Sequence, residues 1–444
     1  MGQLSEAKLG IVRRLIEQAP DSAVRNLLRA LGADGPHDAG LTRVQQMLEA
    51  EAADRNARNT VFAPIAPLCA APGPFSGLTF PPRTLALLWK ALKQEAPSAV
   101  DAAKAYLCSW RSGDALPEMF DQLCTRAALG LRATGGAFAA AADAADEGAG
   151  RERLAGCLDI ASLTRYGLEQ APEWLGRMNG EKAAKLRLTY RDVCAVADDA
   201  GPRFFEMLTA HLTEPWLILR VIAGVMDHPH ETYASGSELA GFGERVLGDI
   251  DRRLAEIAAF KAASGRQAAH VVAQTVHQVT VELAEIEQSF QLAADGAWGR
   301  RVAKQKKQLA ESIEAVLQTA DRAVAGALPV QTVRIGPRTA KGVPRFTDAP
   351  DPDQVERAAT VLTFVNEVRS SASAGGFASA RAKALEGLEH RLDTYVEDVL
   401  AEIHADDGAD LDRARAFLEI AAELCGLARD DKAAQIVRRR AAAA

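Results

Sequence analysis

The chain has 444 residues, a formal net charge of −7, and 48% hydrophobic but only 5% aromatic residues. This length suffices for several buried cores, whereas the negative charge argues against a dedicated duplex-nucleic-acid-binding protein, because phosphate contacts demand a basic excess. Alanine, the strongest helix former, is frequent and the aromatic residues that sheets favour are scarce, so the composition predicts an all-α protein.

Neither a membrane span nor a targeting signal is expected. The longest apolar run, residues 215–226, is too short to cross a bilayer and contains Arg220. The N-terminal stretch lacks the uninterrupted apolar core of a secretory signal. The six cysteines form no C-x-x-C pair, a pattern typical of small buried side chains rather than of a metal site. We therefore expect a cytoplasmic protein without a metal or cofactor.

The N-terminal part of the chain predicts three helices, over residues 5–19, 20–32 and 41–59. Pro20 stands at the start of the second helix and Gly32 at its end, as helix termini prefer. Further helical segments follow from about 82 to 235, and their short connections predict that neighbours pack antiparallel. We assign residues 1–235 to an N-terminal helical lobe.

Residues 59–82 interrupt this helical pattern. Six prolines in the segment exclude regular helix or central strand, yet its apolar content is too high for a solvated linker. One interpretation is an ordered loop packed across the neighbouring helices. The other is an apolar partner-binding segment, because long loops in compact domains often carry function. In the second interpretation the anchors are Phe62, Ile65, Phe75 and Phe80.

The most regular periodicity lies in the middle of the chain. Apolar residues there alternate spacings of four and three, which is typical of knobs-into-holes helix packing. They are Val272, Val276, Val279, Leu283, Ile286 and Phe290. Similar stripes in 247–257 and 309–320 are out of register with it across glycine-containing breaks. We therefore expect residues 236–328 to form a bundle of long helices that turn back on one another, with coiled-coil-like spacing.

A basic run, "WGRRVAKQKKQL" at residues 298–309, lies at the start of the last of these helices. On a helical wheel its basic residues segregate from the apolar stripe, as on any surface helix. Those opposite the stripe are Arg300, Arg301, Lys304 and Lys307. The run is either a solvated, salt-bridged face or a site for an anion or acidic partner. If the nearby linker folds back onto this helix, Arg334, Arg338, Lys341 and Arg345 join the run in a single anion site.

The last third of the chain consists of a Pro/Gly-rich charged linker, 329–353, and a C-terminal helical lobe, 354–444. Within that lobe Asp406, Asp407 and Asp410 match the D-D-x-x-D spacing with which helical prenyl-transferring enzymes hold magnesium diphosphate. Gly408 lies inside the motif, and no second aspartate-rich helix accompanies it. The three aspartates therefore fit a turn and a helix N-cap better than a metal site.

These observations together predict an all-α, multi-lobed helical bundle. We expect a non-catalytic cytoplasmic scaffold or adaptor that binds another protein and that could also self-associate, with no role in nucleic-acid binding. The alternative is a helical protein that binds an anionic ligand, such as a nucleotide, a phospholipid or RNA, through its basic helix and loop. A magnesium-dependent helical enzyme using the three aspartates is the third hypothesis.

Overall fold

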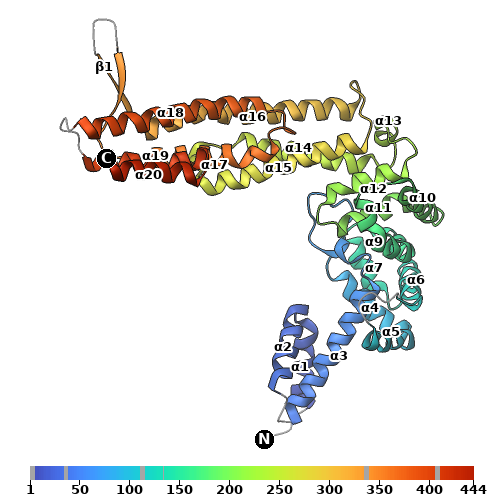
Figure 1. Cartoon of the computed structure of the whole chain (residues 1–444). Helices are drawn as coiled ribbons and strands as arrows, with labels where there is room; N and C mark the ends of the chain where they lie inside the picture. The colour runs from blue at the N-terminus through green and yellow to red at the C-terminus, as the bar shows by residue number, and fades with distance from the viewer. Residues whose placement is uncertain (1–5, 35–38, 111–115, 134, 335–339, 406–410) are drawn as a thin grey trace. The chain divides into compact units, whose positions relative to one another are not determined.

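The computed structural model describes residues 6–34, 39–110, 116–133, 135–334, 340–405 and 411–444. The chain divides into two compact units, unit 1 (Met1–His228) and unit 2 (Pro229–Ala444). Nearly all regular structure in the described ranges is helical, which confirms the all-α prediction (Figure 1). None of the described helices is both long enough and apolar enough to cross a membrane. The expected lobe boundary near residue 235 lies inside unit 2, which also contains the expected bundle, linker and C-terminal lobe.

Unit 1 is a succession of short helices joined by tight connections. The helices are α1 (Glu6–Gln18), α2 (Asp21–Asp34), α3 (Ala39–Val61), α4 (Thr84–Glu95), α5 (Pro97–Ser109), α6 (Met119–Arg132), α7 (Ala139–Asp146), α8 (Arg151–Asp159), α9 (Ala161–Leu175), α10 (Gly180–Cys194), α11 (Ala200–His211) and α12 (Ile218–Val225). Two short 3₁₀ turns, η1 (Ala66–Cys69) and η2 (Pro215–Leu217), complete the unit.

Helix α3 connects two hydrophobic cores of unit 1. It packs on α1 and α2 around a small core that includes Ile16, Val24 and Leu48. It also packs on α5 and α6 within a larger core. The buried Arg55 stabilises the first contact, because its guanidinium donates to the Ile16 carbonyl at 2.8 Å and to Asp21 Oδ1 at 2.7 Å. A single charged side chain thereby satisfies the end of α1 and the start of α2.

The proline-rich segment after α3 is an ordered part of the core. Prolines have no N–H group, so such a loop has more carbonyl acceptors than donors. Later helices supply donors where the segment leaves α3: Arg165 donates to the carbonyls of the last two residues of that helix, Thr60 at 3.1 Å and Val61 at 3.2 Å. His211 Nε2 lies 3.2 Å from the Pro64 carbonyl, and burial lowers the pKa of His211, which favours the neutral ring.

The four apolar anchors expected in this segment are all buried. Phe62 and Ile65 are 0% exposed, Phe80 is 3% exposed, and Phe75 is 8% exposed. Phe62 also packs edge-on against Trp89 with ring centroids 6.3 Å apart. The segment thus has the arrangement of the first interpretation, a loop packed across helices, and these side chains do not form an exposed surface.

Unit 2 is built from longer helices and one hairpin. Its elements are α13 (Glu231–Ser235), α14 (Ala240–Ala258), η3 (Ala262–Ser264), α15 (Arg266–Ser289), α16 (Ala297–Ala327), β1 (Val330–Arg334), β2 (Ala340–Pro344), α17 (Pro352–Glu367), η4 (Val368–Ser371), α18 (Ala378–Ala405), α19 (Leu411–Ala428) and α20 (Asp431–Ala443).

Helix α16 is the central element of unit 2 and contacts α14, α17 and α18 (Figure 1). Trp298 bonds to Glu244 of α14, and Gln305, seven residues later, bonds to Asp251, seven residues later in α14. The two helices therefore run parallel. Helix α15, which lies between α14 and α16 in the sequence, runs in the opposite direction, as the register breaks predict. One side of α16 is buried, and burial of each large apolar side chain contributes about 1.5–3 kcal/mol. The buried residues include Trp298, Val302, Leu309, Ile313, Leu317 and Val324.

The expected 329–353 linker contains an antiparallel β-hairpin rather than only irregular loop. Val330 pairs with Pro344 and Val333 with Lys341. The Arg345 N–H donates to the Pro329 carbonyl at 3.0 Å. Because hydrogen-bonded and non-hydrogen-bonded pairs alternate along an antiparallel ladder, the next pair, which contains Pro344, needs no N–H. Two prolines can therefore border a sheet, which is why counting prolines and glycines did not predict these strands.

Replacing Arg165 tests how the proline-rich segment is held. We expect Arg165→Ala to lower the free energy of unfolding of unit 1 by about 1–3 kcal/mol, because two part-buried carbonyls lose a charged donor. Urea unfolding followed by tryptophan fluorescence measures this, since most tryptophans lie in unit 1. The exposed Arg191→Ala is the matched control. Equal stability of the two variants would contradict this account of the loop.

Candidate functional site

The N-terminus of α16 is built around a buried carboxylate. Glu231, 2% exposed, accepts hydrogen bonds from the backbone N–H groups of Ala293 (2.9 Å), Trp298 (2.7 Å) and Gly299 (3.2 Å). Free N–H groups at a helix start attract negative charge, so Glu231 occupies the position that an external anion would otherwise take. A Cβ at Gly296 would lie 2.2 Å from the Glu231 carboxylate, which explains the glycine.

Trp298 fixes the lateral position of the same turn. Its ring lies where a Cβ on Gly243 would come within 2.3 Å, so a glycine in α14 allows the close contact. Its indole Nε1–H donates to Glu244 Oε1 at 2.7 Å. Phe290 packs edge-on against it with centroids 5.5 Å apart. The free backbone N–H groups of this first turn of α16, which could bind an anion, are thus already bonded to a carboxylate of the same chain. We call this first turn, together with Glu231, the α16 joint.

The basic run of α16 divides into paired and free residues. Arg301 bonds to Glu244 at 2.8 Å and to Asp251 at 2.7 Å, both on α14. Lys307 lies 3.7 Å from Glu311 on its own helix. Arg300 and Lys304 are exposed, and no ion pair to either is found among the described residues. Half of the expected basic face therefore takes part in salt bridges of the fold.

The second expected basic group lies at the other end of α16. The hairpin follows the C-terminus of the helix (Figure 1). Lys304 lies 23 residues before that C-terminus, roughly 35 Å along the helix axis. Lys341 pairs with Asp398 at 3.1 Å, and Arg345 lies 3.8 Å from Asp348. Arg334 is exposed, while Arg338 lies outside the described residues. Among the described residues, the two basic groups thus lie at opposite ends of α16 and do not meet.

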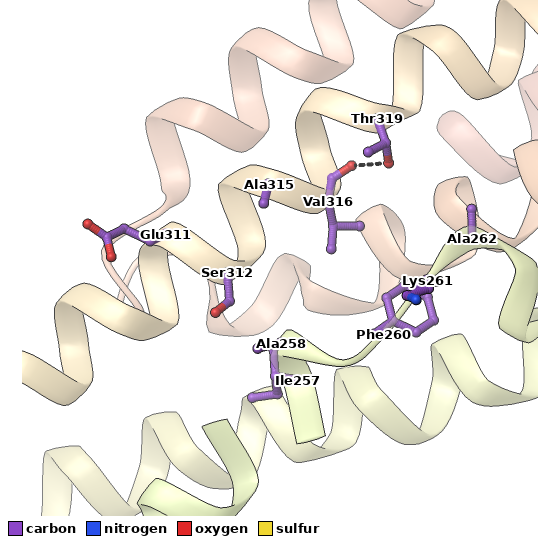
Figure 2. Close-up of a pocket in the computed structure, with 10 residues that line it drawn as sticks. All are labelled: Ile257, Ala258, Phe260, Lys261, Ala262, Glu311, Ser312, Ala315, Val316 and Thr319. Atoms are coloured by element: carbon purple, nitrogen blue, oxygen red, sulfur yellow. Dashed lines mark hydrogen bonds between the residues drawn. The ribbon is translucent and has the colours of Figure 1, made fainter. Parts of the chain in front are cut away.

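A groove lies on one side of α16 where α14 ends. Figure 2 shows its lining, with Phe260 and Lys261 from the chain after α14 facing Val316 and Thr319 of α16. Its volume is about 500 Å³. The remaining lining residues are mostly small, namely Ile257, Ala258, Ala262, Glu311, Ser312 and Ala315. The groove exists because α14 stops at Ala258 while α16 continues beyond it.

A second groove lies on the other side of the same part of α16. It has a volume of about 530 Å³ and is formed between α16 and α18. Its lining residues are Glu314, Leu317, Gln318, Asp321, Ser379, Ala380, Lys383, Ala384, Gly387 and Leu388. The outer face of α16 from Glu311 to Asp321 is therefore a ridge between two hollows. Small side chains beside a ridge of this kind permit close approach of another helix.

Buried ionisable groups of unit 2 lie away from both grooves. Burial raises the pKa of Glu282 to about 7, although Gln278 donates to it at 2.9 Å and Arg253 lies 3.6 Å away. The other Glu282 oxygen has no hydrogen-bond partner. Within the described parts of the chain, no three His, Cys, Asp or Glu side chains are grouped to hold a metal ion. Asp406, Asp407 and Asp410 lie outside those parts.

The grooves and the α16 joint were not expected from the sequence. The signal that could have indicated the joint is the pair Gly296 and Gly299 on either side of Trp298, which breaks the helical pattern just before a long amphipathic helix. Nothing in the local sequence links these glycines to Glu231. The groove of Figure 2 forms where one helix ends beside another that continues. Because this depends on how distant segments pack, the local sequence does not indicate it.

Comparisons of the chain with protein-family models, with curated proteins and with solved structures found no match.

Glu231 provides a stability test of the α16 joint. We expect Glu231→Ala to lower the free energy of unfolding of unit 2 by about 3–5 kcal/mol, because buried N–H groups lose their acceptor. Hydrogen exchange measured by mass spectrometry should show faster exchange around the start of α16. Glu231→Gln retains one carbonyl oxygen and should lose less. The exposed Asp295→Ala is the control, and equal exchange in all three variants would count against the joint.

Glu282 should make the stability of unit 2 depend on pH. Its folded pKa of about 7 exceeds the usual value of 4.5, so between these pH values the folded state binds more protons than the unfolded state. Stability is therefore fully present below pH 4.5 and falls as pH rises through 7. Relative to Glu282→Gln, the wild-type chain should lose about 1–3 kcal/mol between pH 5 and pH 8. Thermal unfolding at both pH values measures the difference, and the exposed Glu386→Gln should behave as wild type.

Proposed function

We propose that this chain is a non-catalytic cytoplasmic scaffold or adaptor whose unit 2 binds an α-helix of a protein partner. The observation that carries the proposal is the α16 ridge, residues 311–321, with grooves of about 500 and 530 Å³ on its two sides. Grooves between helices, lined mainly by small and apolar side chains, suit a helix that inserts its side chains on both sides of a ridge.

The chemistry of the two grooves supports binding rather than catalysis. Their charged residues, Lys261, Glu311 and Glu314 among them, are exposed to solvent, whereas catalytic acids and bases usually lie in desolvated or charge-coupled environments. The cysteines are free thiols, with Cys69, Cys124 and Cys157 buried, which fits the reducing conditions of the cytoplasm.

The pairing of the basic residues weighs against the anionic-ligand alternative. Arg301, Lys341 and Arg345 each have carboxylate partners in unit 2, so an anion would have to displace them. The helix N-terminus closest to the run is filled by Glu231. A polyanion would therefore meet scattered charges rather than a prepared site.

Filling a groove tests the proposal. Ala315 is exposed and lines the groove of Figure 2, so Ala315→Trp should block a partner helix without disturbing the core. The tagged full-length chain, purified from its native host with nuclease treatment, should retain a stoichiometric protein that the Ala315→Trp variant loses at least about tenfold. Ala416→Trp, an exposed alanine on α19 that lines neither groove, should retain it. Equal recovery of that protein from all three chains would contradict the proposal.

A further inference from the structure

The outer face of α16 carries a stripe of exposed side chains whose charge changes sign at its middle. In order they are Arg300, Lys304, Lys307, Glu311, Glu314 and Gln318, and all six are exposed. The spacings are four, three, four, three and four residues, so the stripe follows one side of the helix. Its first half is basic and its second half acidic or neutral. Asp321, further along, already pairs with Arg391 of α18 at 2.6 Å.

This stripe is symmetric about position 309. An antiparallel copy of the helix, related by a two-fold axis at that position, places Lys304 opposite Glu314 and Lys307 opposite Glu311 of the other copy. Arg300 then lies opposite Gln318, whose amide oxygen can accept from the guanidinium. Each pairing occurs twice because the axis repeats it. A helix that is basic at one end and acidic at the other is thus complementary to itself only in the antiparallel orientation.

The stripe is available for such pairing. Side chains of Lys307 and Glu311 are 76% and 62% exposed, and their mutual separation of 3.7 Å is a weak intrahelical contact. The other basic residues of the run point elsewhere, since Arg301 bonds to α14 and Lys306 bonds to Glu287 of α15 at 2.8 Å. Grooves lie on both sides of the stripe at residues 311–319, so the stripe stands above its surroundings there and a second helix can reach it.

We propose that the partner helix at the α16 ridge is α16 of a second copy of this chain, bound antiparallel through the stripe from Arg300 to Gln318. The proposal rests on the proposed function and names its partner. Charge complementarity selects the second copy, since the basic and acidic halves match each other residue by residue. Exposed ion pairs contribute little individually, so the dimer should be weak and should dissociate as salt rises.

A charge exchange tests this proposal. Lys304→Glu with Lys307→Glu makes the stripe acidic, and Glu311→Lys with Glu314→Lys makes it basic. Each double variant alone should show a dimer association constant at least about tenfold below wild type in sedimentation velocity, because like charges then face each other. An equimolar mixture of the two variants should recover association as a heterodimer. Arg415→Glu with Arg439→Glu, on the exposed surfaces of α19 and α20, is the matched control.

Chemical cross-linking tests the orientation independently. Gln308 lies next to the proposed axis, so its two copies are about 3 Å apart along the helix direction, whereas two copies of Thr319 are about 30 Å apart. With the exposed Cys108 and Cys194 replaced by serine, a short bis-maleimide should join Gln308→Cys chains but not Thr319→Cys chains.

The outcomes separate this inference from the proposed function. A wild-type chain that remains monomeric at low salt, or double variants that dimerise as wild type does, would overturn the α16 pairing. If a different protein is then lost on Ala315→Trp, the adaptor function stands with another partner. If the chain is monomeric and no protein depends on Ala315, both proposals fail.

Discussion

A helix that begins inside a protein must find acceptors for its first N–H groups, and in unit 2 one carboxylate meets this requirement for the longest helix. Glu231 accepts hydrogen bonds from the N–H groups of Trp298 and Gly299 and of the preceding Ala293. The position of α16 along its own axis is set by this contact. Trp298 then sets its distance from α14, because the ring occupies the space that Gly243 leaves open. The α14–α16 interface, its ion pairs and the grooves beside it all depend on that start.

The same requirement divides the charges of α16 between structure and surface. Arg301 and Lys306 face α14 and α15 and are used in salt bridges of the bundle. Residues one position away, such as Arg300 and Lys307, point outward. One side of α16 therefore carries charged residues that pair with neighbouring helices. The other side carries a charge pattern that no contact among the described residues of unit 2 explains. That exposed side, with its change in the sign of charge, is the surface to which we assign a partner helix.

Unit 1 solves a related problem in the opposite way. Its proline-rich segment has too few donors of its own, and side chains of Arg165 and His211 on later helices supply hydrogen bonds to its carbonyls. Phe62 and Ile65 of this segment are fully buried. This apolar, proline-rich segment is thereby part of the core of unit 1.

The sequence by itself determined the helical class, the approximate extent of most helices, and the separation of apolar and charged faces on α16. These are properties of local propensity and of the 3.6-residue period, so neighbouring residues suffice to predict them. Only the tertiary structure decided which carboxylate meets which N–H group or arginine, because Glu231 and Trp298 are 67 positions apart and many acidic residues are equivalent on a helical wheel. It also decided that β1 and β2 pair and that α14 ends beside α16, since both depend on how elements meet in space.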